Sequence, residues 1–206
     1  KSKFVTGAYD FWEASYADVP DETPDSWEPF TDGESLREFM FSLESGHALL
    51  ARLLLAKATE DHDFFPTERG LERYFGELSG GFRGRIDLDA YPIAANGMIE
   101  DMRDQLVESL FEDDIFIWWT EGYGAQTASQ HENQFSRFRD VAREGSTVTK
   151  VSPATRERFS RAIARVAFAV LKFDFASIEG DPLGDLYQRY FDPETRKALG
   201  EFYTPK

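Results

Sequence analysis

Residues 152–173 read SPATRERFSRAIARVAFAVLKF and give the clearest structural signal in the chain. Ser152 suits a helix N-cap, and the proline that follows suits the first helical position. Apolar side chains then recur at three- and four-residue steps, which predicts one buried stripe: Phe159, Ile163, Val166, Val170 and Phe173. Small residues beside the stripe allow a neighbouring helix to approach closely: Ala162, Ala167 and Ala169.

Three arginines, Arg158, Arg161 and Arg165, fall on another face of this helix at steps of three and four residues. Such a face has two interpretations. It is either an ordinary solvated surface, since acidic neighbours are plentiful, or a surface that contacts the phosphate backbone of DNA.

The same apolar periodicity occurs in the segments before this helix. An apolar stripe predicts a long helix over residues 33–60, and shorter helices are expected at 66–79, 91–119 (from about Ile93) and 127–144. Asp181-Pro182 and Asp192-Pro193 each read as a further helix start. Residues 147–151 alternate and are compatible with one isolated short strand. We therefore predict an all-α fold, an irregular bundle of about seven or eight helices with at most one short strand.

Three regions are expected. Residues 1–32 are aromatic, acidic and proline-bearing, and we interpret them as an N-terminal arm whose aromatics anchor onto the helical body. Residues 33–180 form the bundle, and residues 181–206 are a distinct terminal region. The chain starts without Met and stops abruptly at Lys206, so we expect a piece of a longer protein.

Composition narrows the class of protein. Of 206 residues, 41% are hydrophobic and 19 are Phe, so a real core can form. Cysteine is absent, which excludes disulfides and thiol chemistry. We find no apolar run of about 18 residues and no signal peptide pattern, and therefore expect no membrane span and a cytoplasmic location.

The net charge is −15, and seven of the 23 basic residues are Lys. An acidic, Lys-poor surface is typical of a halophilic cytoplasm, because dense counterions screen its self-repulsion. An acidic docking face in a mesophilic protein is the alternative. So acidic a chain is ordinarily a poor DNA binder, and any DNA contact must rest on a few local arginines.

Other candidate sites are weaker. The loop at residues 80–85 carries Arg83 and Arg85, which suit either a phosphate contact or a plain surface loop; the P-loop pattern is missing. His47 is interpreted as a packed core histidine rather than a catalytic base. No metal site is expected from the run at residues 60–63, because adjacent helical residues point apart.

The terminal region reads LGDLYQRYFDPETRKALGEFYTPK over residues 183–206. It resembles the segment that leads into the catalytic domain of N6-adenine DNA methyltransferases, including fused type II restriction–modification enzymes. In that family an L-G-x-x-Y helix precedes a G-x-[FY]-Y-T-P turn beside the S-adenosylmethionine pocket. The resemblance implies a cofactor-binding role for Phe202, Tyr203, Thr204 and Pro205. The stretch at residues 43–61 is also similar to a long helix ahead of the methylase domain, with an Arg-Leu-Leu core and an acidic pair at its end.

The catalytic motifs themselves are missing from the sequence. The chain has no Pro-Pro pair, which the family's catalytic turn requires, and no glycine-bearing cofactor loop. No Lys has an acidic residue two positions before it, as a metal-dependent nuclease would need. We therefore expect a helical connector of a DNA adenine methyltransferase or restriction–modification enzyme, with DNA and S-adenosylmethionine as ligands of the whole enzyme. On that reading this chain alone has no catalytic residue and binds no cofactor. The alternative is a free-standing acidic α-helical interaction module.

Overall fold

The fold was taken from a computed structural model of the chain. The structure describes residues 3–15, 17, 19–20, 23–31, 35–64, 71, 75, 88–103, 115–116, 118–119, 152–180 and 184. These residues contain five α-helices and a 3-10 helix, and none of them lies in a strand. The all-α class is therefore confirmed for this part of the chain. The helix expected at 127–144, the strand at 147–151 and most of the terminal region lie outside the described residues.

Helix α3 (Leu36–Asp61) is the axis of the fold. Its N-cap is Ser35, whose side chain accepts a hydrogen bond from the backbone N–H of Glu38 at 3.1 Å. The helix continues through Gly46 and spans 26 residues, about 39 Å at 1.5 Å per residue. It ends where Asp63 takes a left-handed backbone conformation, with φ at 57°. The helix predicted over 33–60 is thus confirmed.

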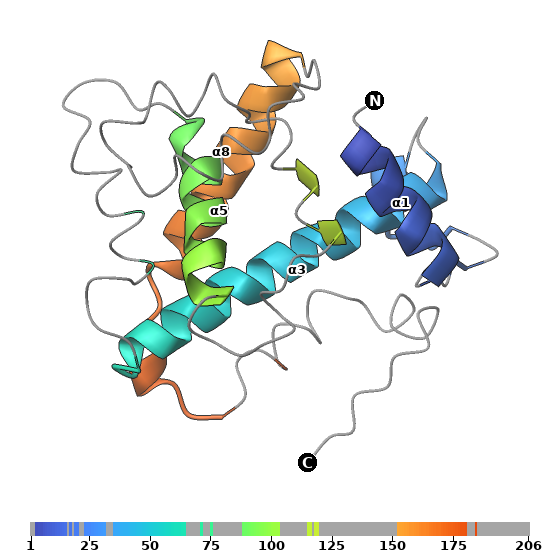
Figure 1. Ribbon diagram of the computed structural model, residues 1–206. Coiled ribbons are helices and arrows are strands. Elements are labelled where there is room, and N and C mark those ends of the chain that lie inside the picture. The colour runs from blue at the N-terminus through green and yellow to red at the C-terminus, as the bar shows by residue number, and fades with distance from the viewer. Residues whose placement is uncertain are drawn as a thin grey trace.

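Helices α5 (Ala90–Arg103) and α8 (Pro153–Val170) pack against each other and against the C-terminal half of α3 (Figure 1). Helix α5 is enclosed on all sides: every described side chain from Ala90 to Ile99 is buried. Two isolated helical residues, Leu71 and Phe75, are fully buried in the same core. Ile99 and Met102 are also buried in this core.

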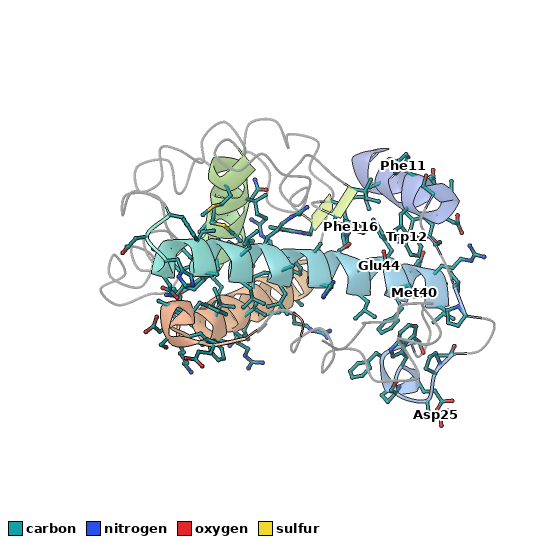
Figure 2. The ribbon with its side chains drawn as sticks, turned by 90° about the horizontal axis from the view of Figure 1, so that it is seen from below. Phe11, Trp12, Asp25, Met40, Glu44 and Phe116 are labelled. Atoms are coloured by element: carbon teal, nitrogen blue, oxygen red, sulfur yellow. The ribbon has the colours of Figure 1, made fainter. Side chains whose placement is uncertain are left out.

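A second, smaller core lies at the N-terminal end of α3, under α1 (Lys3–Ser15) and the short α2 (Glu28–Thr31). Trp12 is fully buried on the side of α1 that faces α3, and its Nε1 donates to Glu44 Oε2 at 2.7 Å (Figure 2). Trp27 is buried as well. The Tyr9 ring packs against Trp12 and Phe41, whereas Phe11 and Phe30 remain exposed. The expected anchoring role therefore holds for Tyr9, Trp12 and Trp27 among the aromatics whose side chains are described.

Trp118 connects the two cores. It packs against both clusters, and its Nε1 donates to Ser45 Oγ at 2.7 Å. The Ser45 hydroxyl in turn donates to the carbonyl of Phe41 at 2.7 Å. The chain after α5 thus returns to the middle of α3 and closes the space between the two clusters.

Of the described helices, α3 is the one that by length and composition is apolar enough to cross a bilayer, which we did not expect from the sequence. Core helices of soluble proteins pass the same test. Helix α3 contacts α1, α2, α5, α8 and the 3-10 helix η3 (Phe175–Ser177), and it buries Arg52 and Lys57 among them. We interpret it as a core helix.

Helix α8 begins as predicted, with Ser152 as its N-cap and Pro153 at the start. Its inward face is made of Ser160, Ile163, Ala164, Ala167 and Val170. Three expectations were wrong: Phe173, Ala162 and Ala169 are exposed. Phe173 leaves the stripe because the helix ends at Val170. The inward face includes Ser160 rather than Phe159, because the Ser160 hydroxyl donates a hydrogen bond to Asp89, just before α5.

Candidate nucleic-acid interface

The residue that orients α8 is Asp89, which directly precedes α5. Ser160 Oγ donates to Asp89 Oδ1 at 2.8 Å, and Arg156 Nε lies 2.8 Å from Asp89 Oδ2. Ser160 is fully buried, and the Arg156–Asp89 ion pair is mostly covered. One carboxylate therefore binds two residues four positions apart on α8, which fixes the rotation of the helix about its axis.

With this rotation the three candidate arginines of α8 face solvent. Arg158, Arg161 and Arg165 are all exposed. Two further exposed residues, Phe168 and Lys172, continue the same line toward the C-terminal end. At 100° per residue the four positions within α8 fall within an arc of about 80°, and Lys172 lies in the turn two residues after the helix ends. We call these five residues the α8 basic strip.

The electrostatics of the strip are locally positive. Glu157 is the sole acidic residue within Pro153–Val170, and it pairs with Arg161 at 2.6 Å across one helical turn. Both side chains of that pair are more than half exposed, so the pair adds little stability and exchanges readily with solvent ions. Arg158 and Arg165 form no ion pair with any other described residue.

The sequence alone identified the arginines but not Phe168 or Lys172. Extending the three- and four-residue steps from Arg161 and Arg165 by two turns would have reached both. Phe168 is 40% exposed. Apolar side chains in a regular helix are expected to face the core, so the sequence alone did not place Phe168 on the exposed face. Its ring packs against Tyr91 of α5, with ring centroids 5.6 Å apart, so Phe168 lies at the border between the packed and the exposed face of α8.

The charged residues of α3 are structural. Arg52 and Lys57, which lie in the stretch similar to the family's long helix, are 1% and 2% exposed. Lys57 donates to Asp61 Oδ1, and Asp61 Oδ2 accepts the backbone N–H of Phe175 at 2.8 Å. Asp61 therefore links the end of α3 to the segment that follows α8.

Three titratable groups in the described part of the chain have shifted pKa values. His47 is half-buried, and burial lowers its pKa, so it is neutral at pH 7. Burial raises the pKa of Tyr91, and burial followed by the charge of Glu13 raises the pKa of Tyr9. Where the structure describes side chains, it brings together no three His, Asp or Glu residues that could hold a metal ion.

The other candidate residues lie outside the described residues. These are the two loop arginines and the four residues of the terminal turn: Arg83, Arg85, Phe202, Tyr203, Thr204 and Pro205. No family model, no curated protein and no solved structure matches this chain.

Proposed function

We propose that this chain is the helical region just upstream of the catalytic domain in an S-adenosylmethionine-dependent DNA adenine methyltransferase, alone or fused to a restriction nuclease. The region supports the methylase domain and is not catalytic by itself. The parent enzyme binds DNA and acts in the cytoplasm.

The observation that carries the proposal is the terminal sequence LGEFYTPK at residues 199–206, which follows an L-G-x-L-Y stretch. The local chemistry agrees with a chain leaving a helix for an extended run. Gly200 suits a helix C-terminus, and the residue before a proline, Thr204, favours extended geometry. In the resembling family this turn lies beside the cofactor.

The second stretch of resemblance lies on α3, where the structure shows how its charged residues are placed. Its two cations, Arg52 and Lys57, are buried, and the acidic residue at the helix end, Asp61, is bonded to Lys57. Buried charges need partners at defined distances, so a core helix of this kind tolerates few alternatives at these positions. The packing of this chain's own core therefore explains these charged residues.

The test uses the full-length product of the native gene in a DNA methylation assay with S-adenosylmethionine. We expect adenine methylation, and we expect Tyr203→Ala and Thr204→Ala each to weaken cofactor affinity. The matched control is Phe30→Ala, which removes an exposed aromatic ring at the other end of the chain. Unchanged cofactor affinity in both turn variants would make the turn a mere linker.

The competing function is a free-standing acidic module that binds other proteins. The net charge of −15 and the exposed Phe11 and Phe30 favour it. It requires a reading frame that stops near residue 206 and a protein product without cofactor affinity.

A further inference from the structure

The α8 basic strip concentrates positive charge on a strongly acidic chain. Arg158, Arg161 and Arg165 are exposed along one line of α8, and the exposed Lys172 follows in the turn after the helix. The Phe168 ring beside them is 40% exposed and packs against Tyr91 of α5. The chain as a whole has 38 acidic against 23 basic residues. The average composition predicts an acidic surface, and this positively charged surface differs from it.

We propose that the α8 basic strip binds the phosphate backbone of duplex DNA. This inference rests on the proposed function, which supplies DNA as the partner. It assigns the contact to this helix, and it places the helix along the backbone, with no side chain reading bases.

The dimensions of the strip suit such a partner. Arg158 and Arg165 are seven residues apart, about 10 Å along the axis of α8, and Lys172 follows after the end of the helix. One strand of DNA carries one phosphate per about 3.4 Å of duplex axis, so the three arginines span the backbone of about three base pairs. Three of the four cations are arginines, whose planar guanidinium groups bind phosphate oxygens in a bidentate manner.

The strip is also held in place before any ligand arrives. Asp89 fixes the rotation of α8 through Ser160 and Arg156, on the face opposite the strip. Binding then does not have to pay for ordering the helix, and only the long side chains lose freedom.

Glu157 limits the affinity of the strip. Its carboxylate occupies Arg161, so that arginine must exchange a carboxylate for a phosphate when DNA binds. Removing the carboxylate should free Arg161 and tighten binding. Glu13 offers a matched control, because it pairs with Arg37 at 3.0 Å on the far end of the molecule, also at the surface.

The experiment measures binding of the 206-residue chain to a labelled 30-base-pair duplex by fluorescence anisotropy, from 0.05 to 0.4 M KCl. Arg165→Gln is compared with Arg37→Gln, and Glu157→Gln with Glu13→Gln. The two members of each pair change the net charge equally and differ in location. Circular dichroism checks that all four variants fold.

We expect Arg165→Gln to weaken binding on the order of fivefold to tenfold at 0.1 M KCl, since each phosphate contact contributes about 0.9 to the salt slope. Arg37→Gln should change binding far less. Glu157→Gln should tighten binding several-fold more than Glu13→Gln. Replacing Arg158, Arg161 and Arg165 together should lower the salt slope by about 2 to 3.

Three results would overturn the inference. One is a wild-type chain that does not bind the duplex at 0.05 M KCl, and another is an equal effect of Arg165→Gln and Arg37→Gln. The third is loss of self-association in Arg165→Gln, measured by sedimentation, with DNA binding unchanged. That result would assign the strip to the acidic surface of a second copy.

Failure of this inference is distinguishable from failure of the proposed function. A full-length product that methylates DNA and is indifferent to Arg165→Gln would keep the methyltransferase assignment and remove the strip. If the chain binds the duplex through the strip but its gene encodes no cofactor domain, the DNA-binding strip stands and the methyltransferase assignment falls.

Discussion

The substitution Asp61→Asn tests how the end of α3 is built. The Lys57 and Asp61 side chains are 3% and 10% exposed, and Lys57 Nζ donates to Asp61 Oδ1. Asn keeps an oxygen that can accept the backbone N–H of Phe175, which now donates to Asp61 Oδ2 at 2.8 Å. The substitution therefore removes the carboxylate charge beside a buried ammonium group and replaces the oxygen that Lys57 contacts with an amide NH2, which is a donor.

We expect Asp61→Asn to lower the free energy of unfolding by about 3 to 5 kcal/mol, the usual cost of breaking a buried ion pair from one side. The double variant with Lys57→Met replaces both charges and should lose only about 1 to 2 kcal/mol. Lys57→Met alone leaves the Asp61 carboxylate buried without this cation and should also cost about 3 kcal/mol or more. A double-mutant cycle should therefore give a coupling energy of at least about 4 kcal/mol between the two positions. Urea unfolding followed by circular dichroism measures all four proteins.

Glu157→Gln is the matched control, because the pair Arg161–Glu157 has the same four-residue spacing but is exposed. It should cost no more than about 0.5 kcal/mol. The reasoning is refuted if Asp61→Asn costs as little as Glu157→Gln, or if the coupling energy between Lys57 and Asp61 is near zero.

Two further predictions concern pH and salt. Burial lowers the pKa of His47, so the unfolded chain binds more protons than the folded chain below pH 6.5 and stability falls as pH falls through that value. Urea unfolding should show that the free energy of unfolding falls less for His47→Gln than for the wild type between pH 7.5 and 5.5. An equal fall in both proteins would show that the His47 imidazole does not contribute to the pH dependence. If the acidic, Lys-poor surface is a salt adaptation, Tm should rise between 0.1 and 2 M KCl, since counterions screen the net charge of −15. A flat Tm would favour a mesophilic protein with an acidic docking face.

The helices that the sequence predicted well are those with local signals. Ser35 and Ser152 cap α3 and α8 as side-chain acceptors, and apolar periodicity runs through both helices. Helix α1 was not predicted as a helix, because its aromatic and acidic residues carry no clear cap and precede a proline-rich loop. The burial of Trp12 depends on Glu44, which is 32 residues away.

The same distinction applies to the candidate site. The exposed arginines of α8 follow from periodicity, but the rotation of the helix depends on Asp89, which lies 71 residues before Ser160. No local pattern contains that pairing, so the inward position of Ser160 was not predictable. Likewise, Lys57 is buried because residues after α8 return to Asp61, 114 positions away from Phe175.

The most direct measurement of the central claim is S-adenosylmethionine binding by the full-length product of the native gene, by isothermal titration, alongside the sequence of that gene beyond codon 206. The account predicts a continuing reading frame with a glycine-bearing loop and an N-P-P-[FY] turn, and saturable cofactor binding. A stop codon near residue 206, or a longer product that does not bind S-adenosylmethionine, would contradict it.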